Sequence, residues 1–151
     1  MKTVDHTSVH GPIERAFETA SAVELWPDFL PHYRWVRMLS RDGNSGLVEM
    51  AAWRPFGIFK YPTWWVSEMT VVPNEFRVLY KHVRGITKGM DVEWRLIENA
   101  GSVDITIVHQ WAGPQWPLIG KLAADLVIGP VFIHAIASRT LAGVKEHTEQ
   151  V

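Results

Sequence analysis

Two histidines on predicted strands are the side chains best suited to acid–base chemistry in this sequence. His82 alternates with Val78 and Tyr80 in one strand-like run. His109 alternates with Ile107 in another. Side chains two apart on a strand share a face, so both imidazoles are predicted to face inward. An imidazole titrates near neutral pH and can act as an acid or base. An inward histidine is equally typical of a hydrogen-bonded core residue, and both interpretations stay open.

Other catalytic chemistries lack the residues that they need. The chain has no cysteine, which excludes disulfides, thiol catalysis and cysteine-bound metals. His6 and His10 are four apart on a predicted strand, roughly 13 Å, too far to share a metal. Ser67 lies outside any G-x-S-x-G turn, which argues against a nucleophilic role. The glycines form no phosphate-binding loop. We therefore expect no metal and no cofactor.

The composition is that of one globular domain spanning residues 1–151. The net charge is −1, without the basic excess of a nucleic-acid-binding protein. The N-terminus has no apolar segment typical of a secretory signal, so we expect a cytoplasmic protein. The apolar run 126–137 is too short and interrupted to span a membrane. Contact with a membrane surface stays open. Eight tryptophans favour a large core, a ligand cavity or an interface.

The positions of turn residues predict an antiparallel sheet and a long final helix. The fold class is α+β: a seven-stranded curved antiparallel sheet around a C-terminal helix, with two short helices after the first strand. Strands are predicted over residues 2–10, 33–41, 45–54, 63–72, 75–84, 89–97 and 102–111. Short helices are predicted over residues 12–20 and from Pro27. The final helix is predicted over 118–147, about 45 Å long, with a kink at Gly129 and Pro130.

Alternation within the strands predicts which side chains face the helix. These inward residues could form an aromatic wall around a ligand or pack as an ordinary core, and the sequence does not decide between the two. Arg84 ends one strand, either at a cavity mouth or in solvent. The candidate ligand-binding residues are Trp65, Met69, Tyr80, Trp94, His109, Trp111, Arg84 and, on the helix, Ile133.

The order of these motifs resembles the START and birch-pollen-allergen superfamily, which has the helix-grip fold. Within it, the sequence is most similar to the polyketide cyclase/dehydrase family. The resemblance covers nearly the whole chain and rests on the P-I-E-R-A-F segment from Pro12, on L-W-P at 25–27, on Tyr33, on W-W-V-S-E at 64–68, on Pro73 and on the run 89–94. It implies a cavity between sheet and helix that holds an apolar or aromatic ligand.

The resemblance also implies a set of site residues. In aromatase/cyclases one strand carries Trp, Ser and Arg facing the cavity, and the next strand supplies a second Arg. Here those positions read Trp65, Ser67 and Met69, followed by His82, so both arginines are replaced. Tyr33 matches a cavity tyrosine that could position a carbonyl group. The implied catalytic residues are His82 as acid or base, with Ser67 and Tyr33 as orienting groups.

Three functions follow from these observations. The first is binding of a hydrophobic small molecule such as a polyketide, a quinone or a lipid-like compound. The second is a cyclase, aromatase or dehydratase acting on a poly-keto chain, for which the resemblance implies an acyl carrier protein as partner. The third is a protein-interaction module, indicated by the aromatic segment 56–62, which could form a rim with residues 116–118 or a dimer contact. The sequence leaves a monomer and a homodimer open.

Overall fold

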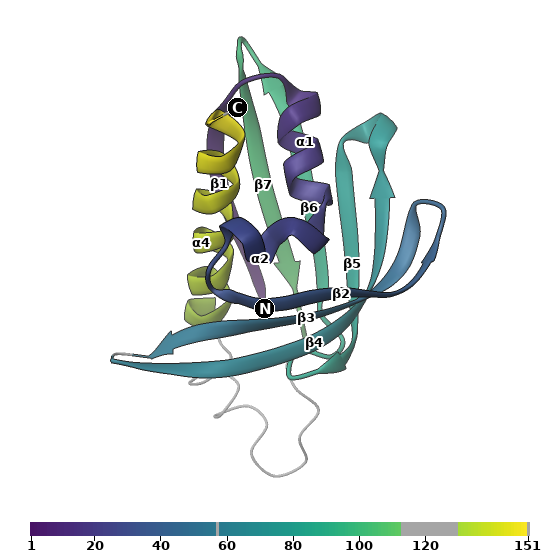
Figure 1. The fold of residues 1–151 in the computed structure, drawn as a ribbon, viewed down its shortest axis with the longest axis vertical. Coiled ribbons are helices and arrows are strands. Elements are labelled where there is room, and N and C mark those ends of the chain that lie inside the picture. The colour runs from purple at the N-terminus through teal and green to yellow at the C-terminus, as the bar shows by residue number, and fades with distance from the viewer. Residues whose placement is uncertain (57, 113–129, 151) are drawn as a thin grey trace.

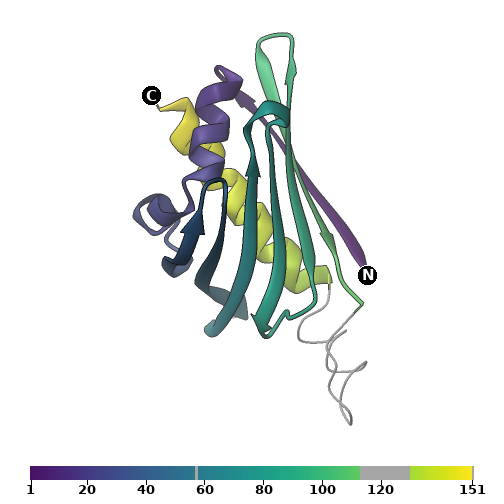
Figure 2. The same cartoon turned by 90° about the vertical axis from the view of Figure 1, so that its right-hand side faces the viewer.

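The chain folds into one curved antiparallel sheet that packs against a long C-terminal helix (Figures 1 and 2). The computed structural model describes residues 1–56, 58–112 and 130–150. In chain order the elements are β1 (Lys2–His10), α1 (Ile13–Ser21), η1 (Val23–Leu25), α2 (Trp26–Phe29), β2 (Tyr33–Asp42), β3 (Ser45–Phe56), β4 (Phe59–Val72), η2 (Pro73–Glu75), β5 (Arg77–Gly85), β6 (Asp91–Asn99), β7 (Ser102–Gln110) and α4 (Pro130–Glu149).

The seven strands lie in the order β1-β7-β6-β5-β4-β3-β2. Consecutive strands from β2 to β7 pair as hairpins, and β1 pairs antiparallel with β7 and forms one edge of the sheet. Figure 2 shows α4 running along the concave side of the sheet. The predicted fold class, a seven-stranded helix-grip fold with short helices after the first strand, is confirmed.

The core lies between the concave face of the sheet and the helices. Strand β6 shows the alternation that produces it: Val92, Trp94 and Leu96 are buried, whereas the residues between them point outward. Helix α1 buries one apolar side, including Phe17, and contacts α4. Each of these faces removes apolar side chains from water, which is the main stabilising term of the fold.

The segment predicted as an aromatic loop, residues 56–62, is mostly strand. The prediction treats Pro55 and Pro62 as strand ends, but β3 and β4 continue past both. Strand β2 pairs with β3 only as far as Ala52, and β5 pairs with β4 only as far as Trp65. The far end of the hairpin therefore has two free edges, where a proline without an N–H group is tolerated. Figure 1 shows this hairpin projecting past α4.

Helix α4 is described from Pro130 onward. The predicted start of this helix at residue 118, the kink at Gly129 and the rim residues 116–118 lie outside the described residues. The described helix ends at Glu149, two residues beyond the predicted end. None of the helices in the described part of the chain is long and apolar enough to cross a membrane.

Candidate functional site

A cavity of about 70 Å³ lies between the concave face of the sheet and α4. Its walls are formed by the six strands β2 to β7, by the turn that follows β5, by α2 and by one side of α4. The lining residues are Trp26, Tyr33, Met50, Trp65, Tyr80, His82, Thr87, Met90, Val92, Trp94, Ile107, His109, Ile133, Ile136, Ala137 and Thr140.

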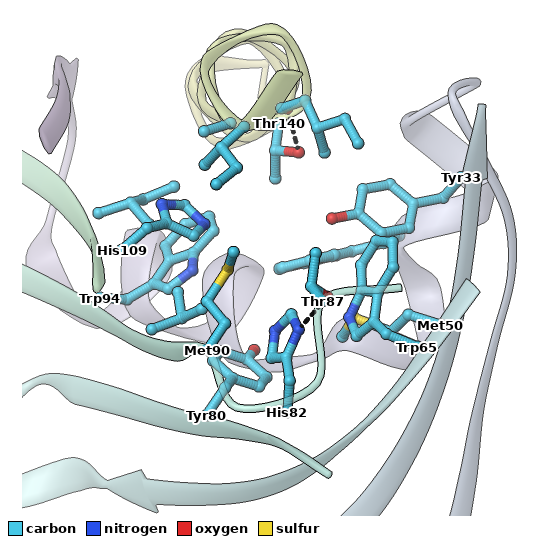
Figure 3. A pocket seen from close by; sticks show the side chains of 16 residues that line it. Tyr33, Met50, Trp65, Tyr80, His82, Thr87, Met90, Trp94, His109 and Thr140 are labelled. Atoms are coloured by element: carbon cyan, nitrogen blue, oxygen red, sulfur yellow. Dashed lines mark hydrogen bonds between the residues drawn. The ribbon is translucent and has the colours of Figure 1, made fainter. Parts of the chain in front are cut away.

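Aromatic side chains from opposite ends of the sheet face each other across this cavity. Figure 3 shows Tyr33 and Trp65 on one side and His109 with Trp94 on the other. Thr140 of α4 lies above, and the tip of Met90 points into the space between. The curvature of the sheet brings β2 and β7, which do not pair with each other, to the two sides of one pocket.

The cavity wall is uncharged at neutral pH. Among the described residues that line it there is no Asp, Glu, Lys or Arg. Burial lowers the pKa of His82 to about 3, with a smaller contribution from His109. Burial also lowers the pKa of His109 to about 4 and raises that of Tyr33 to about 12. In each case burial penalises the charged form. Both imidazoles and the phenol are therefore neutral.

A hydrogen bond and a stacked ring hold the His82 side chain in place. Nδ1 of His82 and the hydroxyl of Thr87 are 2.6 Å apart and share a buried hydrogen bond. Thr87 belongs to the turn between β5 and β6, so this bond ties the turn to the strand. The imidazole lies parallel to the indole of Trp65. The ring is thus fixed from two directions.

Two polar atoms in the cavity wall have no partner in the described part of the chain. These are the hydroxyl oxygen of Tyr80 and Nδ1 of His109, and both are buried. A buried polar group without a hydrogen bond costs roughly 1–3 kcal/mol. A ligand with an oxygen atom near either group would remove that penalty. The two atoms are therefore the natural polar contacts for a molecule in the cavity.

The structure brings most of the predicted site residues together. Seven of them line the cavity: Tyr33, Trp65, Tyr80, His82, Trp94, His109 and Ile133. Four do not: Ser67, Met69, Arg84 and Trp111. Ser67 is fully buried within the sheet next to His82, and its hydroxyl has no partner among the described residues. Trp111 donates its indole N–H to the carbonyl of Lys88 at 2.9 Å.

A β-bulge explains the position of Arg84. His82 pairs with Ser67, but Arg84 pairs with the next residue of β4, Val66, so that Val83 is left without a partner. A bulge inserts one extra residue and resets the alternation. Arg84 therefore points away from the face that carries His82 and is exposed. The expectation that alternation continues to the end of the strand is wrong here.

Several residues that line the cavity are not among the site residues predicted from the sequence. Trp26 lies in the L-W-P segment, whose single helical turn carries the indole into the cavity wall. Thr87 lies in a turn and has no strand or helix periodicity. Thr140 falls on the inner side of the predicted helix, which could have indicated its place. No comparable signal marks Met50, since the prediction does not divide its strand into faces.

The sheet, the helix along its concave side and the cavity between them define the helix-grip fold. Residues 9–129 match the family described as "Polyketide cyclase / dehydrase and lipid transport". The chain belongs to this family.

Solved structures share this fold at low sequence identity. The protein TTHA0849 from Thermus thermophilus is 16% identical, with a TM-score of 0.83 over 98% of this chain and 97% of that one. The ZhuI aromatase/cyclase from a Streptomyces species is 15% identical, with a TM-score of 0.80 over 99% and 94%. Major latex-like protein 151 from Panax ginseng is 10% identical, with a TM-score of 0.75 over 98% and 97%. No curated protein matches the chain by sequence.

Proposed function

We propose that this protein binds an uncharged, largely apolar small molecule with a ring, such as a polyketide or a quinone, in the cavity between the sheet and α4. The observation that carries the proposal is the character of the cavity wall. It combines aromatic and aliphatic side chains with two unpartnered polar atoms, on Tyr80 and His109, and has no charged side chain among the described residues. Such walls with a few placed polar groups are typical of small-molecule sites.

The size of the cavity sets a condition on this binding. Its 70 Å³ is less than the roughly 150 Å³ cavity that holds benzene in another protein. A ring can enter only if lining side chains move. Met50 and Met90 can move at little cost, because methionine is unbranched and has three rotatable bonds. We expect both to change rotamer on binding.

The first experiment is native mass spectrometry of the purified protein, followed by fluorescence titration with ring-containing probes. The naphthoquinone menadione and the anthraquinone emodin test the proposed class, and palmitate, which is anionic, serves as comparison. We expect saturable quenching of tryptophan emission by the ring compounds, because Trp26, Trp65 and Trp94 line the cavity. Palmitate should bind more weakly, since the described wall offers no cation.

A pair of matched variants locates the bound probe. Tyr80→Phe removes the buried hydroxyl and should weaken binding of emodin about fivefold, the value of one neutral hydrogen bond. Tyr61→Phe removes a hydroxyl from an exposed tyrosine outside the cavity and should leave the affinity unchanged. Equal affinities for all three proteins, or no binding by the wild type, would contradict the proposal.

A second candidate is cyclisation of a poly-keto chain, and it is favoured by the family and by the position of His82 beside the cavity. Tyr33 lines the same space and could orient a carbonyl group. The pKa of about 3 makes His82 a weak base at neutral pH, however, because an effective base has a pKa near the working pH. Formation of a cyclised product by the wild type, lost in His82→Ala, would establish this function over simple binding.

A further inference from the structure

The far end of the β3–β4 hairpin exposes a cluster of large apolar side chains. Ile58 is 93% exposed, Phe59 69% and Tyr61 51%. Each would gain by burial, and no other described segment gathers three exposed large hydrophobic residues within four positions. The hairpin that carries them extends beyond the pairing limits of both neighbouring strands (Figure 1).

Cations surround the base of this hairpin tip. The guanidinium carbon of Arg34 lies 4.6 Å from the ring centroid of Trp53 and 4.7 Å from that of Trp35. The ammonium group of Lys60 lies 5.9 Å from the Trp53 ring. Lys60 itself stands between the exposed Phe59 and Tyr61 in the sequence. The tip thus combines an apolar end with a positively charged, tryptophan-rich base.

Glu49, an acidic group beside Trp35 and Trp64, is already engaged. Both carboxylate oxygens of Glu49 accept indole N–H bonds, one from Trp35 at 3.0 Å and one from Trp64 at 3.1 Å. Arg37 approaches the same carboxylate at 3.8 Å. Arg34, Lys60 and Arg139 are exposed cations near the tip. Glu146 of α4 is an exposed carboxylate that lines the same depression, so the cations outnumber it. The surface complements an anionic partner.

We propose that the tip of the β3–β4 hairpin docks on an anionic lipid bilayer, with Ile58, Phe59 and Tyr61 inserted at the boundary between headgroups and acyl chains. Aromatic residues favour that boundary, because it accepts both an apolar ring and a polar edge. Lys60 would reach the phosphate layer with its ammonium group while its alkyl stem stays among the apolar side chains. Arg34 adds attraction to anionic lipids.

A bilayer fits these side chains better than a nucleic acid does. Single-stranded nucleic acids need open aromatic faces on which bases stack. Arg34 lies over the rings of both Trp35 and Trp53, so each ring has one side occupied. The most exposed residue, Ile58, has no ring at all. A small inserted apolar group with nearby cations is typical of reversible membrane binding.

The test is co-sedimentation of the full chain with vesicles made of equal parts phosphatidylcholine and phosphatidylglycerol. We expect binding that weakens as salt is added, and little binding to vesicles of phosphatidylcholine alone. The double variant Ile58→Ser with Phe59→Ser should lower the partition coefficient about tenfold or more. Lys60→Glu should lower it on the anionic vesicles while leaving any residual binding to neutral vesicles unchanged.

A matched control separates insertion of the hairpin tip from nonspecific adsorption of exposed apolar side chains to the vesicles. Ile97→Ser changes an isoleucine that is 62% exposed on another strand and should bind vesicles as the wild type does. Circular dichroism shows whether each variant is folded. Equal vesicle binding by the hairpin and control variants would overturn the proposal. A wild type that fails to bind vesicles would also overturn it. In that case, a dimer that the double variant disrupts would assign the tip to self-association, and binding of poly(dT) would assign it to nucleic acid.

Discussion

The imidazole of His82 lies parallel to the indole of Trp65, with ring centroids 5.8 Å apart and an angle of 3° between the planes. The two residues belong to neighbouring strands, and the bulge in β5 follows directly after His82. Ser67, the direct partner of His82 across the sheet, is fully buried. This arrangement leaves the imidazole buried, where its protonated form is unstable.

We predict that His82 and His109 stay neutral well below neutral pH in the folded protein. Burial lowers their pKa values to about 3 and about 4. In a nitrogen-15 NMR titration of the folded protein, their ring resonances should show the neutral form down to about pH 5. In the urea-unfolded chain, all histidines should titrate with a pKa of about 6.5. Protonation of either ring near its ordinary pKa would show that water reaches the cavity wall.

The free energy of unfolding should fall as the medium is acidified from about pH 6.5 towards about pH 4. The unfolded chain takes up protons at its histidines near a pKa of about 6.5. Burial, reinforced by Arg139, lowers the pKa of His32 to about 4, and the pKa values of His82 and His109 are lowered by burial as well. Because the unfolded state then binds more protons, stability decreases by up to about 1.4 kcal/mol per pH unit for each histidine. Urea unfolding at several pH values measures the slope, and His82→Phe should reduce it.

The variant Tyr80→Phe should be more stable than the wild type in the absence of ligand. The Tyr80 hydroxyl is buried and has no partner in the described chain, so removing it relieves a penalty of about 1 kcal/mol. Equilibrium unfolding in urea measures the difference. A less stable variant would show that the hydroxyl makes a hydrogen bond in the ligand-free protein. Higher stability together with weaker emodin binding would show that the Tyr80 hydroxyl forms its hydrogen bond with the ligand and not within the protein.

Gly85→Ala should destabilise the fold strongly. Gly85 has φ of +98°, and a Cβ atom there would lie 2.2 Å from the carbonyl oxygen of Trp64 and 2.6 Å from Cα of Trp65. Both are backbone atoms that cannot move without disturbing β4. Gly101 has φ of +90° with nothing within 4 Å, so Gly101→Ala controls for the backbone conformation alone. We expect a loss of about 1 kcal/mol for Gly101→Ala and of about 3 kcal/mol or more for Gly85→Ala. Thermal or urea unfolding measures both losses of stability. Equal losses for the two variants would contradict the close approach of Gly85 to the backbone of β4.

Sequence patterns predict the architecture because most of it depends on local periodicity. The first strand is predicted over residues 2–10 and is observed there, since β-branched residues recur along it up to Gly11. Alternation in the run 90–97 predicts the buried face of β6 correctly. The antiparallel order follows from short turns between strands. In these cases the information lies within ten neighbouring residues.

The parts that sequence reasoning missed depend on where neighbouring strands stop. The hairpin tip continues as strand past Pro55 and Pro62 because its neighbours end earlier, a fact set by the register of other strands. Arg84 leaves the inner face because of one unpaired residue, which no local pattern reveals. The cavity residues Trp26 and Thr87 come from a single helical turn and a tight turn, whose positions are fixed by tertiary packing.

The pairing of β1 with β7 places the first strand made beside the last. During synthesis on the ribosome, β2 to β6 can form hairpins as they emerge, but β1 has no partner until residues 102–110 leave the exit tunnel. Throughout that time β1 is an unpaired strand that can pair with other chains. A chain that stops before residue 102 therefore has a β1 strand without its partner. Truncated products of this protein should aggregate and depend on chaperones, whereas in the full chain β1 is paired with β7 along its whole length.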